Sequence, residues 1–195
     1  MSKRIFLAIK INPEPELLDL FDLIRDELAG EQIKWVDEDQ FHITLKFFGD
    51  TPENKIGNIS ASVKECCLQH HSFSFDLCNP WYFRKHQQPS VIFLQSAKTD
   101  ELSALQKDLE NHFNRLDIPK EEKDFKPHLT LGRVKSINDQ EAFYTLMKQF
   151  PQKSIQPVPV CDVILYESIL KPSGPEYLAL ERFKLIETSA AGQIF

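Results

Sequence analysis

The chain has 195 residues, of which 42% are hydrophobic and 27% charged, and its formal net charge is −6. This length allows one sizeable domain or two small lobes that share a core. The acidic balance argues against a broad nucleic-acid surface, which is usually basic, but leaves room for a small basic pocket around one phosphate group.

The N-terminal stretch MSKRIFLAIKIN has too short an apolar run for a signal peptide, and no window approaches a membrane span. The four cysteines are expected as free thiols in a reducing compartment: Cys66, Cys67, Cys78 and Cys161. The sequence therefore predicts a cytoplasmic protein with no membrane association.

Roughly the first 70 residues predict two strands, each followed by a helix. Residues 4–11 alternate with β-forming side chains. The helix that follows opens at Pro15, has apolar residues every three or four positions, and can end at Gly30. Residues 41–47 alternate as a strand that Gly49 closes, and an apolar stripe after it predicts the second helix.

The rest of the chain predicts strands at residues 73–77, 81–83, 91–94, 128–134, 160–170 and 177–186. Residues 84–89 are expected as a polar loop. Thr99 or Asp100 can cap a helix. A charged segment and then a further helix with an apolar face over residues 143–150 come later, and residues 151–159 are expected as a loop or an edge segment.

Strands interleave with helices without strict β-α-β repeats. This is typical of an α+β fold whose antiparallel sheets are covered on one face by helices. No low-complexity tract or linker divides the chain. We therefore predict a single domain over residues 1–188 and a flexible C-terminal tail over residues 189–195.

Two tetrapeptides of one pattern lie in the two halves of the chain, HITL beginning at His42 and HLTL beginning at His128. Such a tetrapeptide is expected by chance roughly 0.02 times in a chain of this composition, so two copies indicate a shared role. Because side chains alternate along a strand, Thr44 shares a face with His42, and Thr130 shares a face with His128. If the aliphatic residues pack under helices, both polar faces line one cleft.

Two imidazoles and two hydroxyls suit acid–base chemistry at a phosphorus centre. Histidines can serve as general base and general acid in one in-line displacement at neutral pH. Threonine hydroxyls can donate hydrogen bonds to the non-bridging oxygens. No carboxylate belongs to the set, so this chemistry does not require a metal. Hydrolysis of a cyclic phosphodiester fits, with the neighbouring ribose hydroxyl as the leaving group.

The paired motifs resemble those of the 2H phosphoesterase superfamily, and in particular its bacterial RNA 2′,3′-cyclic phosphodiesterase family, also called 2′-5′ RNA ligases. Four blocks carry the resemblance: IKWVDEDQFHITLKFFGD, PWYFRKHQQPSVIFLQ, FKPHLTLGRV and VILYESILKPSGPEYLALERFKL. They span most of residues 4–186. The resemblance implies a bilobal α+β fold, with two pseudo-symmetric lobes of antiparallel sheet, helices outside and a central cleft between the histidines.

The resemblance also implies an activity, which is hydrolysis of 2′,3′-cyclic phosphates on RNA 3′ ends or nucleotides to 2′-phosphates. Members of this family can also join RNA ends through a 2′-5′ linkage. At the positions that match the family's motifs, the resemblance implies that His42 is the proton donor to the leaving 3′ oxygen and that His128 is the proton acceptor that activates water. It also implies that Thr44 and Thr130 bind the phosphate oxygens. Pseudo-symmetry leaves the reverse order of the histidines open. No metal or other cofactor is implied, and a monomer is expected.

Arg133 is a further candidate for phosphate binding, since the family often has an arginine five residues after the second histidine. Strict alternation would place Arg133 on the face opposite to His128. A bulge at Gly132 would return it to the site. The alternative is an exposed arginine at a strand end.

Other features allow two interpretations each. The stretch CCLQHH at residues 66–71 suggests zinc, but adjacent thiols and adjacent imidazoles on a helix cannot all point at one ion, so a partly buried helix end is preferred. Residues 84–86 either contact RNA phosphates or form a solvated loop. By strict alternation Lys46 lies on the same strand face as His42. It either makes the electrostatic potential of the cleft more positive or is simply exposed. Finally, the cleft itself could bind RNA or nucleotides without turnover.

Overall fold

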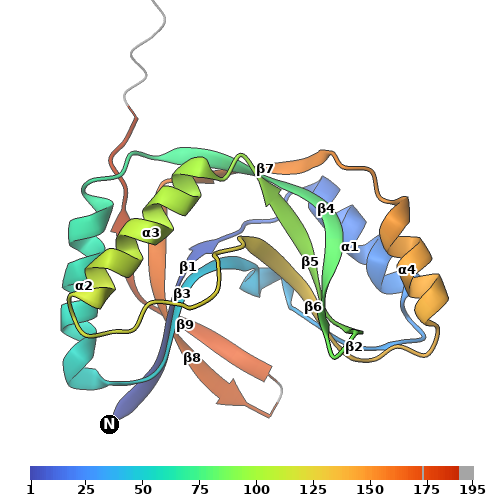
Figure 1. Cartoon of the computed structure of the whole chain (residues 1–195), viewed down its shortest axis with the longest axis horizontal. Helices are drawn as coiled ribbons and strands as arrows, with labels where there is room; N and C mark the ends of the chain where they lie inside the picture. The colour runs from blue at the N-terminus through green and yellow to red at the C-terminus, as the bar shows by residue number, and fades with distance from the viewer. Residues whose placement is uncertain (173, 189–195) are drawn as a thin grey trace, which may run out of the picture.

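Two antiparallel sheets, each covered by two helices, make up the computed structural model, which describes residues 1–172 and 174–188 (Figure 1). In spatial order, the four-stranded sheet contains β3 (His42–Pro52), β1 (Ser2–Lys10), β8 (Asp162–Lys171) and β9 (Gly174–Lys184). The five-stranded sheet contains β2 (Gln32–Trp35), β6 (His128–Ser136), β5 (Gln88–Ala97), β4 (Phe73–Lys85) and β7 (Ser154–Val160). This is the predicted α+β fold with two lobes of antiparallel sheet.

The four helices are divided equally between the two sheets. Helices α2 (Glu53–Cys67) and α3 (Asp100–Asn114) cover the four-stranded sheet, whereas α1 (Pro15–Glu27) and α4 (Gln140–Gln149) cover the five-stranded sheet (Figure 1). Each sheet is thus covered by one helix from the first half of the chain and one from the second. None of the four is long and apolar enough to cross a membrane, and this holds for every helix among the described residues.

Helix α1 shows how the local sequence fixes the position of a helix on its sheet. Pro15 occupies its first turn, where the missing N–H costs nothing, and Leu17, Phe21 and Ile24 lie buried on one face. The buried amide of Gln156 on β7 holds the entry to the helix. Its Oε1 accepts from the Glu14 N–H and its Nε2 donates to a carbonyl of the preceding turn, both at 2.9 Å.

One hydrophobic core runs through both lobes. It joins buried residues of the four-stranded sheet, such as Ile5 and Ile43, with Ile92 and Leu129 of the five-stranded sheet, and with the inner faces of all four helices. The aliphatic positions of both motifs therefore point into the core, as the alternation predicted.

Most predicted elements are confirmed, and the differences lie in the strands. The pieces predicted at residues 73–77 and 81–83 form one strand, and the loop predicted at 84–89 shrinks to a tight turn at His86 and Gln87, both with positive φ. Most of residues 151–159 belong to the edge strand β7, which extends to Val160, and the short strand β2 was not predicted. The tail predicted at residues 189–195 lies outside the described residues.

Candidate active site

The two motif histidines begin the two strands that meet between the sheets. His42 is the first residue of β3, an edge strand of its sheet, and His128 is the first residue of β6. Because β2 pairs only with the later part of β6, the first residues of β6 are left open toward β3. Both histidines line one cavity of about 240 Å³, together with Thr44, Thr130 and Arg133. All five predicted site residues are thus brought together.

Both imidazoles are oriented by the same local contact. The Nδ1–H of His42 donates to the main-chain carbonyl of Gln40, and that of His128 donates to the carbonyl of Lys126, each at 2.7 Å. A carbonyl can only accept, so Nδ1 carries the proton in both rings and Nε2 is left for chemistry. The two sites are therefore equivalent in tautomer, which is the pseudo-symmetry expected from the motifs.

Aromatic rings hold each imidazole from the side. Phe6 and Tyr177 lie 5.1 and 5.3 Å from His42 between ring centroids. Phe83 and Phe93 lie 4.9 and 5.3 Å from His128. These contacts are largely edge-to-face, the arrangement that aromatic quadrupoles favour. The rings restrict rotation of the imidazoles and also remove water from around them.

Burial lowers the pKa of both histidines below the ordinary value of 6.5. Desolvation is the largest cause in each case, and the carbonyl hydrogen bond opposes it. The positive charges of Lys10, Arg133 and His128 lower the pKa of His42 further, while for His128 the added charge is that of Arg133. Burial thus favours the neutral form of both rings in the unliganded protein, whereas an anion between them would favour their protonation.

Bulges shape both motif strands in the same way. On β3, Ala8 pairs with Thr44 and Leu7 pairs with Lys46, so Leu45 is the extra residue. On β6 the extra residue is Leu131, between the pairs that Phe93 makes with Thr130 and Ile92 makes with Gly132. A bulge reverses the alternation after it. The fifth residue after each histidine therefore returns to the face that carries the histidine.

This reversal places Arg133 in the site. The predicted bulge exists, although at the residue before Gly132. Gly132 has a different role, because a Cβ there would lie 2.8 Å from side-chain carbons of both Ile33 and Trp35. The glycine thus lets β2 approach β6. The positive charge of Arg133 acts to lower the pKa of both histidines and of Tyr177, which places this charge near all three groups.

The same reversal makes both interpretations of Lys46 wrong. Its side chain is buried under the sheet, where Nζ contacts a Glu110 carboxylate oxygen at 3.0 Å and donates to the Pro119 carbonyl at 2.8 Å. The Glu121 carboxylate lies 3.7 Å from Nζ of Lys46, and the main-chain N–H of Glu121 donates to the Glu110 carboxylate. This buried pair anchors residues 119–126, here called the strap, which ends at the carbonyl that orients His128.

Sequence reasoning missed two contributors to the cavity. Tyr177 on β9 lines the cavity and packs against His42, but only the pairing of β8 with β9 brings it there. The segment from Lys34 to Asp37 forms another wall. Its one signal was the position of Trp35 in the first motif block, and Trp35 packs edge-on against Phe21.

The alternative sites are placed differently by the structure. Cys66 and Cys67 are buried, which raises the pKa of each thiol to about 12, and His70 bonds to Asp108. Among residues 1–172 and 174–188, no three His, Cys, Asp or Glu side chains are grouped to hold a metal ion. The guanidinium of Arg84 lies over the rings of Tyr82 and Tyr144, and Arg84 also lines a second hollow beside His128.

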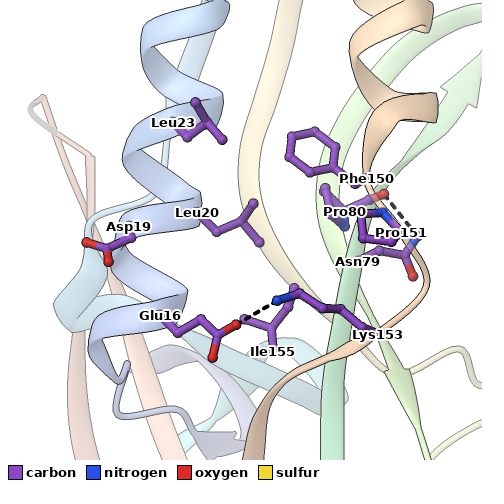
Figure 2. A pocket seen from close by; sticks show the side chains of 10 residues that line it. All are labelled: Glu16, Asp19, Leu20, Leu23, Asn79, Pro80, Phe150, Pro151, Lys153 and Ile155. Carbon is purple, nitrogen blue, oxygen red and sulfur yellow. Dashed lines mark hydrogen bonds and ion pairs between the residues drawn. The ribbon is translucent and has the colours of Figure 1, made fainter.

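Two further hollows differ in character. One, of about 240 Å³, lies between α1, β4 and the end of α4, is walled by apolar groups such as Leu20 and Phe150, and is closed at one end by the Glu16–Lys153 ion pair (Figure 2). It contains none of the motif residues. The other, of about 760 Å³, adjoins the cavity of the two histidines and shares Thr44 and His128 with it.

The two-sheet α+β architecture, with two His-x-Thr-x strands that share one cavity, defines a 2H phosphoesterase fold. The 2′-5′ RNA ligase superfamily model matches residues 13–168, and the chain belongs to this family.

Relatives agree with this placement over nearly the whole chain. The chain is 31% identical to an RNA 2′,3′-cyclic phosphodiesterase of Methanothermobacter thermautotrophicus over 95% of this chain and 100% of the relative. It is 33% identical to one of Thermotoga maritima over 91% and 92%. A solved structure from Thermus thermophilus superposes with a TM-score of 0.76 at 27% identity, over 93% and 97%. Escherichia coli LigT shares the fold, with a TM-score of 0.72 at 20% identity, over 95% and 99%.

Proposed function

We propose that this protein hydrolyses 2′,3′-cyclic phosphodiesters at the ends of RNA or on nucleotides and releases 2′-phosphates. The observation that carries the proposal is the cavity in which two imidazoles are held in one tautomer, with two hydroxyls and a guanidinium beside them. The names of the curated relatives, which are RNA 2′,3′-cyclic phosphodiesterases, support the same reaction.

In the proposed step, water attacks phosphorus in line with the 3′ oxygen. Nε2 of His128 takes a proton from the water while the new P–O bond forms. The P–O3′ bond breaks, and Nε2 of protonated His42 gives its proton to the leaving 3′ oxygen. Thr44, Thr130 and Arg133 bind the non-bridging oxygens, where charge accumulates. Burial, and after it the charges of Lys10 and Arg133, lower the pKa of His42, so its protonated form is a stronger acid than an ordinary imidazolium.

The same geometry supports joining of RNA ends. A 5′-hydroxyl in place of water would lose its proton to His128 and form a 2′-5′ phosphodiester, and the 3′ oxygen would again leave with a proton from His42. Incubation of a cyclic-phosphate RNA with a 5′-hydroxyl RNA, followed by gel separation, tests this extension. Absence of a longer product would leave hydrolysis as the only reaction.

The test of hydrolysis is product analysis. Purified protein, in EDTA, is incubated with a 2′,3′-cyclic nucleotide and followed by phosphorus NMR. We expect a 2′-phosphate, and 10²- to 10⁴-fold lower kcat in each of His42→Gln and His128→Gln, roughly the contribution of one acid or base. A 3′-phosphate would refute the leaving group. Nucleotide binding without turnover would refute the hydrolase and favour a binding module.

The pH profile tests the two-histidine scheme independently. A reaction that needs one neutral and one protonated imidazole gives a bell-shaped curve of kcat/KM, governed by the pKa values of the pair. Because the pKa of each histidine is lowered from 6.5, the maximum should lie on the acidic side of that value. A profile that is flat between pH 5 and 8 would contradict the scheme.

A further inference from the structure

The two lobes differ in the residue that faces each motif histidine from the neighbouring strand. In the first lobe Lys10 on β1 pairs with His42, and in the second lobe Gln95 on β5 pairs with His128. Directly paired residues on antiparallel strands point to the same face of the sheet, with Cβ atoms about 4.5–5.5 Å apart. A cation therefore lies beside one imidazole, and an uncharged amide lies at the equivalent place beside the other.

Lys10 also holds the turn that orients His42. Its Nζ donates to the main-chain carbonyl of Asp39, in the 3-10 turn that precedes β3. The next carbonyl of the same turn, that of Gln40, accepts from Nδ1 of His42 at 2.7 Å. The Gln40 side chain ties the turn to β9, because its Nε2 donates to the Pro175 carbonyl at 3.0 Å. The orientation of His42 thus depends on a turn that Lys10 fixes from β1.

The surroundings of His42 show which charges reach it. On the side of the cavity, the charged and titratable groups are those of Lys34, Asp37, His128 and Arg133. On the other side, a hollow of about 150 Å³ is lined by Lys10, Asp39, Tyr166, Glu176 and Tyr177. After burial, the charges of Lys10, Arg133 and His128 lower the pKa of His42, in decreasing order, whereas for His128 the charge is that of Arg133. Arg133 acts on both rings, so Lys10 is the group that distinguishes them.

We propose that Lys10 is a positioning residue for His42, which fixes the turn behind this imidazole and places a positive charge beside it. The inference rests on the proposed function, in which His42 gives a proton to the leaving oxygen. A cation next to an imidazolium makes it a stronger acid, and a fixed ring keeps its proton aimed at that oxygen. His128 has the amide of Gln95 at the equivalent place, so it keeps more of its strength as a proton acceptor. Lys10 and Gln95 thus give two rings of one tautomer different acid strengths.

The first experiment measures the pKa of each histidine in the unliganded protein by NMR of labelled imidazoles, with His42→Gln and His128→Gln to assign the signals. Lys10→Met should raise the pKa of His42 and leave that of His128 in place, whereas Lys10→Arg keeps the charge and should keep the pKa of His42 low. Gln95→Lys gives the second lobe a cation and should lower the pKa of His128. An unchanged pKa of His42 in folded Lys10→Met overturns the proposal. If Lys10→Met does not fold, an unchanged pKa of His128 in Gln95→Lys overturns it.

The second experiment measures kcat/KM against pH with 2′,3′-cyclic AMP. Because the maximum lies midway between the two pKa values of the pair, Lys10→Met should move it to higher pH by about half of the change in the pKa of His42. The value of kcat should fall by about 10-fold or more, because His42 is less firmly oriented. Lys10→Arg should restore the position of the maximum. Lys153→Met removes an equal charge at the edge of the apolar hollow and should move neither kcat nor the maximum (Figure 2).

The two experiments separate this proposal from the proposed function. A lower rate of Lys10→Met with an unmoved maximum would mean that Lys10 only packs against the turn, and it overturns the proposal. Inactivity of the wild type would refute the proposed function instead. The NMR titration needs no turnover, so it would still decide whether Lys10 sets the pKa of His42.

Discussion

Lys46→Met removes the cation that holds the strap from below. The side chains of Lys46 and Glu110 are only 4% and 9% exposed, so the substitution leaves a carboxylate in the interior without its partner. Removing one member of a buried ion pair costs about 3–5 kcal/mol. In a chain of this size each kcal/mol lowers Tm by about 2–4 °C, so Tm should fall by about 6–20 °C.

Urea titration at 25 °C, followed by circular dichroism, measures the free energy of unfolding. The double variant Lys46→Met with Glu110→Leu removes both charges, and should regain most of the loss because apolar side chains often replace a buried pair at no cost. Lys153→Met breaks the 2.9 Å pair with Glu16, whose members are about 60% exposed, and should cost less than about 1 kcal/mol. If Lys46→Met destabilised no more than Lys153→Met, the strap would not depend on this pair.

Three other perturbations test separate parts of the fold. In phosphate-free buffer the free energy of unfolding should fall as the pH drops below 6.5, because the unfolded chain binds protons that native His42 and His128, with lowered pKa values, do not. The slope, at most about 1.4 kcal/mol per pH unit for each histidine, should shrink when both are replaced by glutamine. Gly132→Ala should lower the free energy of unfolding in urea titration by about 1–3 kcal/mol, and should also lower kcat/KM, because β2 must move to admit the added methyl group. Its control is Gly57→Ala on the exposed face of α2, which should stabilise the protein by about 1 kcal/mol. Equal effects of the two substitutions would refute this reasoning. Gln156→Leu leaves the Glu14 N–H without its acceptor and should lower the free energy of unfolding by about 1–3 kcal/mol; no loss would show that water replaces the amide.

The sequence allowed the fold class, the helices and the four motif residues to be predicted, because each depends on a period that local physics imposes. His42 and Thr44 are two residues apart with no irregularity between them, so alternation places them correctly. The same rule failed at Lys46, because one extra residue in the strand inverts every later side chain and no local pattern announces it.

What remained hidden depends on contacts between distant segments. Strand β2 has four residues and exists because Gly132 lets it approach β6, a relation between positions about 100 residues apart. Tyr177 reaches His42 through the pairing of β9 in a sheet whose other strands come from both ends of the chain. Neither relation has a signature within a short window of sequence, because the partner that decides each one is remote.

The way the chain connects helices and sheets has a consequence for motion. Since α1 follows β1 but covers the five-stranded sheet, and α3 follows β5 but covers the four-stranded sheet, each of these helices is tied to one lobe by the chain and to the other by packing. A hinge between the lobes would have to pull a helix off its core. We therefore expect the two motif strands to keep a constant separation when a ligand binds, with the proposed substrate entering and its product leaving by diffusion through an open cleft rather than by closure and reopening of the lobes.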